Sequence, residues 1–175
     1  MEKLFMAIHI RRAQLSDIRG ITDIYNDAIL TTNATFDTQL KTLPEQRKWY
    51  RGHGPRNPIL VAEENGEIVG WASLSEWSTR CAYADTVEIS LYIAQIHRHK
   101  GIGKLLMKAL IEEGKKTGLH TILSRITGGN EVSVRLHRQF GFKRIGTMKE
   151  VGNKNGQLLD VDMMQLMLEP HDSGR

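Results

Sequence analysis

The pattern of apolar residues changes its period near the middle of the chain. From Asp85 to Ile93 apolar and polar residues alternate, which predicts a β-strand whose apolar side chains share one face while Glu88 lies on the other. From Ile102 onward apolar residues recur at every third or fourth position, which predicts an amphipathic helix that ends near Gly118. Another strand is expected at residues 120–126. A helix between two strands predicts a mixed β-sheet with helices on both faces, in the α/β or α+β class.

Turn and capping signals on either side of this unit indicate further elements. Thr42 and Glu45 have the spacing of a capping box, and Asn65-Gly66 suits the positive φ angles of a tight hairpin turn. The expected elements are a strand at 8–13, a helix at 16–30 capped by Ser16, a helix that starts at Thr42, strands on both sides of Asn65-Gly66, a helix at 130–140 and strands on both sides of 153–156.

The length and composition are typical of an ordinary globular protein. With 175 residues, 40% of them hydrophobic and 25% charged, the chain is long enough for one domain with a substantial core and short for two. We expect a single domain at residues 8–169 and a frayed tail at 170–175. The apolar stretch Leu4–Ile10 is too short to cross a membrane and precedes no cleavage site, so neither membrane insertion nor export is expected.

The cysteine count indicates the cellular compartment, and the net charge indicates the kind of binding partner. Cys81 is the only cysteine, which excludes an internal disulfide and fits a reducing cytoplasm, and we expect its thiol to be buried or partly buried. The formal charge of +4 suits an anionic partner such as a phosphorylated cofactor, and the tightest basic cluster is Arg98–Lys100. The other charges are spread along the chain, so nucleic acid is not the expected partner.

Two glycines stand directly before the central helix, in the sequence RHKGIGK of residues 98–104. Glycine lets the backbone approach a ligand closely, and the N–H groups in the first turn of a helix favour negative charge, so a diphosphate would fit. The alternative is that Gly101 and Gly103 only turn the chain from strand to helix. Leu106 replaces the third glycine of a dinucleotide-binding fingerprint and Leu105 replaces the Ser or Thr of a P-loop, which excludes both motifs.

The remaining pattern, R-x-x-G-x-G between a strand with a carboxylate and an amphipathic helix, resembles the acyl-CoA loop of the GNAT acetyltransferases. The segment NEVSVRLHRQFGF, which contains Asn130 and Ser133, is similar to the last conserved helix of that superfamily. Five further segments resemble the branch that acetylates phosphinothricin, methionine sulfone and methionine sulfoximine, and the resemblance extends from Ile10 to Leu168. They are TNATFDT, WASLSEWSTRCAYADTVEISLYI, GLHTILSRI, VSVRLH and VGNKNGQLLDVDMMQ.

The resemblance implies the GNAT fold, a mixed and strongly bent sheet that opens to admit the pantetheine arm of acetyl-CoA. It implies an N-acetyltransferase that acts on the α-amino group of a small amino acid or a toxic analogue by direct transfer, with acetyl-CoA as co-substrate and no metal. It further implies a homodimer and resistance to an antimetabolite. A non-catalytic acyl-CoA-binding regulatory module is the alternative function, because the same glycine loop would serve it.

The resemblance assigns catalytic roles to Glu88 and His137. A substrate ammonium group must lose its proton before it attacks a thioester, and Glu88 is the candidate base; the alternative is an ordinary surface glutamate. His137 stands where most GNAT enzymes have a tyrosine, in agreement with the phosphinothricin branch, and an imidazolium there would protonate the departing sulfur or orient the substrate. The alternative is a structural histidine inside the helix.

The resemblance also implies two sets of binding residues. Phe36, Arg80 and Tyr83 match the substrate segments of the branch, and the alternatives are core packing for the two aromatic residues and a surface ion pair for Arg80. For Lys100 and Lys104 the alternative is a solvated lysine at a helix start. The residues expected to hold the pantetheine arm and the diphosphate are Leu91, Tyr92, Ile93, His99, Lys100, Gly101, Ile102, Gly103, Lys104, Asn130 and Ser133.

One departure from the branch concerns the choice of substrate. Phosphinothricin enzymes tend to carry an aromatic residue followed by Arg-Trp in the late hairpin, where this chain has Asn155, Gln157 and Leu158. This difference leaves a methionine derivative, another small amino acid or another amine open as the substrate. His97 and His99 lack a third ligand at suitable spacing, so no metal site is expected.

Overall fold

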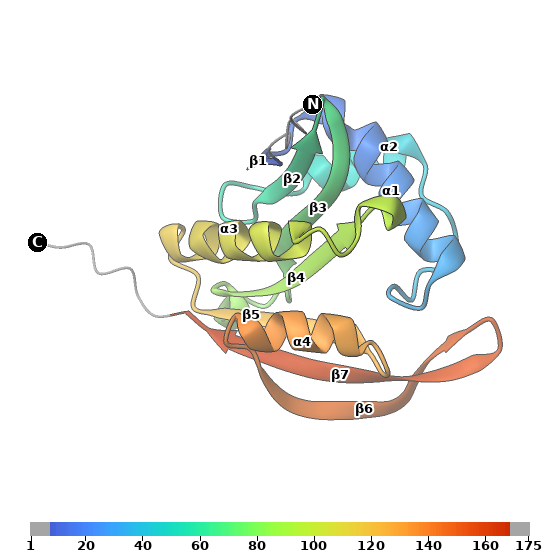
Figure 1. The fold of residues 1–175 in the computed structure, drawn as a ribbon. Helices are drawn as coiled ribbons and strands as arrows, with labels where there is room; N and C mark the ends of the chain where they lie inside the picture. The colour runs from blue at the N-terminus through green and yellow to red at the C-terminus, as the bar shows by residue number, and fades with distance from the viewer. Residues whose placement is uncertain (1–7, 169–175) are drawn as a thin grey trace, which may run out of the picture.

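Figure 1 shows the fold in a computed structural model that describes residues 8–168. No helix in this range has the length and hydropathy needed to cross a membrane. The domain expected at residues 8–169 ends one residue beyond the range, and the tail expected to fray lies outside the described residues. The strands and α-helices are β1 (His9–Arg12), α1 (Ile18–Thr31), α2 (Leu43–Arg51), β2 (Ile59–Glu64), β3 (Glu67–Glu76), β4 (Thr86–Ile93), α3 (Ile102–Lys116), β5 (Thr121–Thr127), α4 (Glu131–Gln139), β6 (Lys143–Lys154) and β7 (Gln157–Met167).

The strands form one mixed sheet in the order β1-β2-β3-β4-β5-β7-β6. β4 and β5 are parallel neighbours, and α3 connects them, as the change of apolar period along residues 85–126 predicted. The other neighbouring pairs among residues 8–168 are antiparallel. A mixed sheet flanked by helices confirms the predicted fold class.

Different helices cover the two faces of the sheet (Figure 1). On one face α3 and α4 enclose the larger core, in which Leu110 of α3 is buried together with Ile89 of β4. On the other face α1 and α2 enclose a smaller core that includes Ile21 and Trp71. Burial of the apolar stripe of α3 stabilises its docking by about 25 cal/mol for each Å² removed from water. Since Ile89 points to α3, the alternating pattern of β4 directs Glu88 to the opposite face.

Local sequence signals account for the turns and for one helix start. Asn65-Gly66 has φ angles of 58° and 81° in the hairpin between β2 and β3, as its sequence predicted. Asn155-Gly156 has φ angles of 53° and 78° in the turn between β6 and β7. At the start of α2 the Thr42 amide donates a hydrogen bond of 2.7 Å to the Glu45 carboxylate, which confirms the predicted capping box.

The cap predicted at Ser16 is wrong. Ser16 lies inside a 3₁₀ turn, Leu15–Asp17, and α1 begins at Ile18. The side chain that organises this turn is Asp17, whose carboxylate accepts hydrogen bonds of 2.7 Å from the Gln14 amide and from the Arg11 guanidinium. A carboxylate satisfies these two donors together, whereas the Ser16 side chain is exposed to solvent.

Candidate active site

β4 and β5 separate beyond Glu88. The two strands pair only through Thr86–Glu88 on β4 and Thr121–Leu123 on β5. Both strands continue past these residues, and a cleft of about 750 Å³ lies at the open end between them. Tyr92 of β4 and Thr127 of β5 belong to its walls. The separation of two neighbouring strands is the feature that the resemblance implied for the pantetheine arm.

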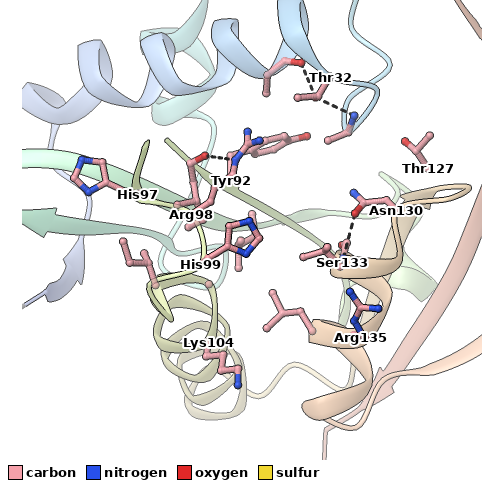
Figure 2. A pocket seen from close by; sticks show the side chains of 18 of the residues that line it. Thr32, Tyr92, His97, Arg98, His99, Lys104, Thr127, Asn130, Ser133 and Arg135 are labelled. Atoms are coloured by element: carbon pink, nitrogen blue, oxygen red, sulfur yellow. Dashed lines mark hydrogen bonds between the residues drawn. The ribbon is translucent and has the colours of Figure 1, made fainter. Parts of the chain in front are cut away.

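The walls of this cleft bring together the segments predicted to bind the cofactor (Figure 2). They come from the end of β4, the loop before α3, the start of α3, and one side of α4 with its N-cap Asn130. The two helices approach closely at Gly103, where an added Cβ would lie 3.4 Å from Leu136 Cδ2. The predicted residues that line the cleft are Leu91, Tyr92, Ile93, His99, Gly101, Ile102, Gly103, Lys104, Asn130 and Ser133.

The segment before α3 has the backbone geometry of an anion-binding loop. His99 and Gly101 have φ angles of 64° and 83°, on either side of Lys100. Alternating left-handed residues of this kind turn successive N–H groups toward one side, where they form a concave site for an anion. Gly101 is the N-cap of α3, and a Cβ there would meet no atom within 4 Å, so the space before the helix start is open. The first N–H groups of α3 are therefore available to a ligand.

Basic side chains surround this loop (Figure 2). Arg98 Nε donates a hydrogen bond of 3.3 Å to the Ile93 carbonyl, which ties the loop to the end of β4. Lys104 projects from α3, and Arg135 projects from the facing α4. Their positive charge raises the local concentration of a polyanion at the mouth of the cleft.

Lys100 does not line the cleft, in contrast to its predicted role. The left-handed residues on either side of it turn its side chain toward His97, and 3.4 Å separates Lys100 Nζ from His97 Nδ1. His97 itself lies 3.0 Å from a carboxylate oxygen of Glu64. The charge that Lys100 was expected to supply comes instead from Arg98 and Arg135.

Glu88 occupies the point at which the two strands part, because it is the last residue of β4 that pairs with β5. The Nε and Nη2 atoms of Arg125 donate hydrogen bonds of 2.6 Å to its two carboxylate oxygens. The side chain of Glu88 keeps 18% of its surface exposed, on the sheet face opposite α3. The carboxylate is therefore reached from that face, while the cleft opens beyond it between the two strands.

A second cavity, of about 340 Å³, hollows this face between the sheet and α2. Ser73 of β3 and Ser90 of β4 stand opposite each other in its wall, and Ser90 is two residues from Glu88. Trp71 also lines the cavity, and its Nε1 and the Ser73 Oγ have no hydrogen-bond partner among residues 8–168. Buried polar atoms without partners favour polar molecules, so this hollow suits a polar acceptor next to Glu88.

Comparison with known proteins identifies the family. The sequence profile of the acetyltransferase (GNAT) family matches residues 21–142. This protein is a GNAT acetyltransferase. The enzyme is 40% identical over 167 residues to the L-methionine sulfoximine/L-methionine sulfone acetyltransferase of Pseudomonas paraeruginosa, with coverage of 94% of this chain and 97% of the relative. It is 36% identical over 158 residues to the phosphinothricin N-acetyltransferase of Streptomyces coelicolor, with coverage of 88% and 92%.

Solved structures agree with this assignment. The acetyltransferase superposes with a TM-score of 0.89, at 34% identity, on a GNAT superfamily phosphinothricin acetyltransferase from Sinorhizobium meliloti in complex with acetyl-CoA; the match covers 97% of this chain and 93% of that one. An N-acetyltransferase from Staphylococcus aureus gives a TM-score of 0.88 at 36% identity, with coverage of 93% and 99%. The predicted superfamily, branch, fold and acyltransferase class are confirmed.

His137 is buried in the acetyltransferase core, outside the walls of the cleft. Its Nδ1 donates a hydrogen bond of 2.8 Å to the Ser133 carbonyl, and its Nε2 lies 3.0 Å from Ser124 Oγ. Its ring packs edge-on against Phe142. Burial lowers the pKa of the His137 imidazole below its ordinary value, which favours the neutral ring. The position therefore favours the structural alternative, and a cationic acid at His137 is not retained.

The buried imidazole makes a testable contribution to pH-dependent stability. The unfolded chain protonates His137 below about pH 6.5, whereas the folded chain does so only at lower pH, so the free energy of unfolding falls as the pH decreases through this range. In a His137→Gln variant we expect this fall to be shallower, by up to about 1.4 kcal/mol per pH unit. Urea unfolding at pH 5 to 7 measures the slope, and equal slopes in both proteins would contradict the assignment.

The predicted substrate residues fall into two groups. The ring of Phe36 packs directly on β6, since a Cβ at Gly152 would lie 2.1 Å from Phe36 Cε2. This contact favours the packing alternative for Phe36. Arg80 and Tyr83 are exposed in the turn between β3 and β4, on the chain that leads to Glu88, and neither lines the cleft or the second cavity.

Two other expectations concern sulfur and metal chemistry. The expectation of a buried Cys81 is wrong: the thiol is exposed, because the residue lies in the surface 3₁₀ turn Cys81–Tyr83 and not in a strand. Residues 8–168 contain no group of three or more His, Cys, Asp or Glu side chains arranged to hold a metal ion.

Several residues of the site were missed by the sequence analysis. Helical spacing from Ser133 could have predicted the other residues of α4 that line the cleft, which are Val132, Arg135, Leu136 and Gln139. Thr32 and Asn33, which directly follow α1, also line the cleft, and no local sequence pattern marks them. Arg125 was also missed, because its contact with Glu88 depends on the register between two strands 37 residues apart in sequence.

Proposed function

We propose that this GNAT acetyltransferase transfers the acetyl group of acetyl-CoA to the α-amino group of a small amino acid or amino-acid analogue. The observation that carries the proposal is the position of Glu88 on the polar face of the sheet, at the point where β4 and β5 part and two residues before Ser90 in the wall of the second cavity. A co-substrate that fills the cleft and an amine that approaches from the polar face meet at this carboxylate. Each reactant then has its own entrance, as direct transfer in a ternary complex requires.

The walls of the cleft fit acetyl-CoA. The left-handed loop at His99 and Gly101, with Lys104 and Arg135 beside it, would hold the diphosphate. Backbone groups of Leu91–Ile93 and the side chain of Asn130 would hold the pantetheine arm. When bound, acetyl-CoA supplies an acyl group activated as a thioester.

Glu88 would accept the proton that the substrate ammonium group must lose, either directly or through a water molecule. Loss of this proton exposes the nitrogen lone pair, which forms the new C–N bond with the acetyl carbon as the C–S bond breaks. The electron pair of the C–S bond leaves with the sulfur of CoA as a thiolate. The nitrogen loses its second proton as the amide forms, and this proton neutralises the thiolate, so CoA leaves as the free thiol. A positioned base contributes about 10²- to 10⁴-fold to the rate of such a step.

The relatives indicate the class of amine. Their names report activity on methionine sulfoximine, methionine sulfone and phosphinothricin, which are all α-amino acids with an oxidised sulfur or phosphorus group. We propose an acceptor of this type, and the resemblance assigns contacts with it to Arg80 and Tyr83, which lie in the turn that leads to Glu88. At the tip of the late hairpin, Asn155 in the turn and Gln157 and Leu158 at the start of β7 are exposed, and they replace the aromatic and Arg-Trp residues expected of a phosphinothricin enzyme. This difference favours a methionine derivative over phosphinothricin.

The surface of the β6–β7 hairpin supports a homodimer. Ile145, Val151 and Leu158 are each more than half exposed there, with relative surfaces of 55%, 53% and 56%. β6 is also an edge strand of the sheet, so its backbone is open to a partner. We propose that a second copy covers this hairpin, that the catalytic domain spans residues 8–169, and that the enzyme acts in the cytoplasm, where it would give resistance to a toxic acceptor.

The test of this function is an amine panel. The protein is incubated with acetyl-CoA and L-methionine sulfone, L-methionine sulfoximine, phosphinothricin or ordinary amino acids, while release of the CoA thiol is followed. We expect release with at least one α-amino acid, together with its N-acetyl product in the mass spectrum. Tight binding of CoA without release for any amine would instead support a regulatory module.

A further inference from the structure

The carboxylate of Glu88 is held by a single arginine from the neighbouring strand. Arg125 uses its Nε and Nη2 atoms, one edge of the guanidinium plane, for the two hydrogen bonds of 2.6 Å to Glu88. This pairing raises the pKa of Arg125. The guanidinium also lies over the ring of Trp77, with 5.6 Å from Arg125 Cζ to the ring centroid. The arginine is therefore fixed in place on two sides.

The other edge of this guanidinium is open. Arginine carries five N–H donors, and a carboxylate can be bound through either Nε and Nη2 or Nη1 and Nη2. Nη1 and the second hydrogen of Nη2 make no hydrogen bond to residues 8–168. The side chain is 52% exposed, on the same sheet face as Glu88. A second carboxylate can therefore be bound beside Glu88 without breaking the existing pair.

We propose that the open edge of Arg125 binds the α-carboxylate of the acceptor and so sets the specificity of the enzyme for α-amino acids. The inference rests on the proposed function, because it assigns the acceptor to the face on which Glu88 is exposed. One carbon separates the amino and carboxylate groups of an α-amino acid, so a carboxylate on Arg125 places the amino nitrogen close to Glu88. Negative Glu88 and positive Arg125 thus complement the ammonium and carboxylate groups of the zwitterion.

The alternative is an ion pair that only stabilises the sheet. Exposed pairs of this kind contribute little to stability, and the chain has a closely matched example in Arg12 and Glu113. Arg12 is 53% exposed and also donates from Nε and Nη2, but it projects from the edge strand β1 to α3, away from the proposed acceptor site. Arg12 is therefore the control for Arg125.

The test compares an amino acid with its neutral counterpart. The acceptors are the panel amino acid with the highest kcat/KM, for which we expect L-methionine sulfone, and its α-carboxamide, in which an amide replaces the carboxylate. Steady-state kinetics are measured for the wild type, Arg125→Gln, Arg125→Lys and the control Arg12→Gln. Calorimetry with acetyl-CoA checks that each variant folds, because neither arginine lines the cleft.

For Arg125→Gln we expect KM for the amino acid to rise about 10- to 100-fold and KM for the carboxamide to change less than about threefold, so the preference for the carboxylate is lost. Arg125→Lys keeps the positive charge but loses the paired N–H donors of the guanidinium, so an intermediate rise in KM for the amino acid is expected. Arg12→Gln should leave both values unchanged.

Equal losses with both acceptors, or no loss with either, would overturn the assignment of Arg125 and leave the acetyltransferase function standing. If Arg125→Gln fails to bind acetyl-CoA, the same comparison of amino acid and carboxamide is made with Arg125→Lys. An unchanged preference of Arg125→Lys for the amino acid over the carboxamide would also overturn the assignment. Absence of transfer by the wild type to any amine would overturn the proposed function itself and the assignment with it.

Discussion

Replacement of Glu88 by glutamine is expected to lower kcat at neutral pH about 100-fold or more. Glutamine has nearly the same shape and keeps one oxygen as acceptor for Arg125, but it cannot take a proton from the substrate ammonium group. The affinity for acetyl-CoA should stay the same, because Glu88 lies outside the walls of the cleft. Stopped assays of N-acetyl product and calorimetry with acetyl-CoA measure the two quantities separately.

Glu112→Gln is the matched control for this prediction. Glu112 is exposed on α3, where it pairs with Lys115 at 3.0 Å, and its loss should change kcat less than about twofold. If Glu88→Gln kept the wild-type kcat, the assignment of Glu88 as the base would be wrong. If it lost affinity for acetyl-CoA instead, its role would be structural support of the cleft.

Replacement of Gly101 by alanine is expected to raise the Kd for acetyl-CoA about tenfold or more, which corresponds to about 1.4 kcal/mol. A Cβ at this position would project into the open space before the start of α3, where the diphosphate is proposed to bind. The positive φ angle of 83° also strains an alanine, which disturbs the N–H groups of the loop. Calorimetry with acetyl-CoA and with CoA measures the loss.

Gly118→Ala separates the effect of backbone strain from the effect of a Cβ in the proposed diphosphate site. Gly118 follows the other end of α3, has a φ angle of 72° and likewise has no atom within 4 Å of an added Cβ, but it does not line the cleft. Both variants should lose about the same stability, near 1 kcal/mol, while only Gly101→Ala loses affinity for the cofactor. Equal affinities in the two variants would place the diphosphate away from this loop.

The elements that position the site could be predicted from the sequence because they depend on local patterns. The alternation of Asp85–Ile93 fixes which side chains of β4 face the core, and the apolar stripe after Ile102 fixes the buried face of α3. Glycine adopts a positive φ angle without strain, so its presence at position 101 indicates the left-handed backbone found there.

Other parts of the site depend on contacts that no local pattern records. The ion pair between Glu88 and Arg125 depends on the register of β4 against β5. The local sequence around Arg125 indicates only an exposed residue of a strand. The direction of Lys100 depends on the left-handed backbone of His99, which is rare for a residue other than glycine. The burial of His137 depends on its packing against Phe142 after the helix ends. The predicted cofactor segments therefore meet at one cleft, whereas the directions of individual side chains such as Lys100 and His137 did not follow from the sequence.

A crystal structure of the protein grown with acetyl-CoA would show directly where the cofactor binds. We expect the diphosphate to contact the backbone of residues 98–104 and the pantetheine arm to run between β4 and β5. We also expect the thioester to end at the point where the strands part, within reach of an amine held beside Glu88. A diphosphate bound elsewhere, or a cleft closed by its own side chains while the nucleotide is bound, would show that this loop is not the cofactor site.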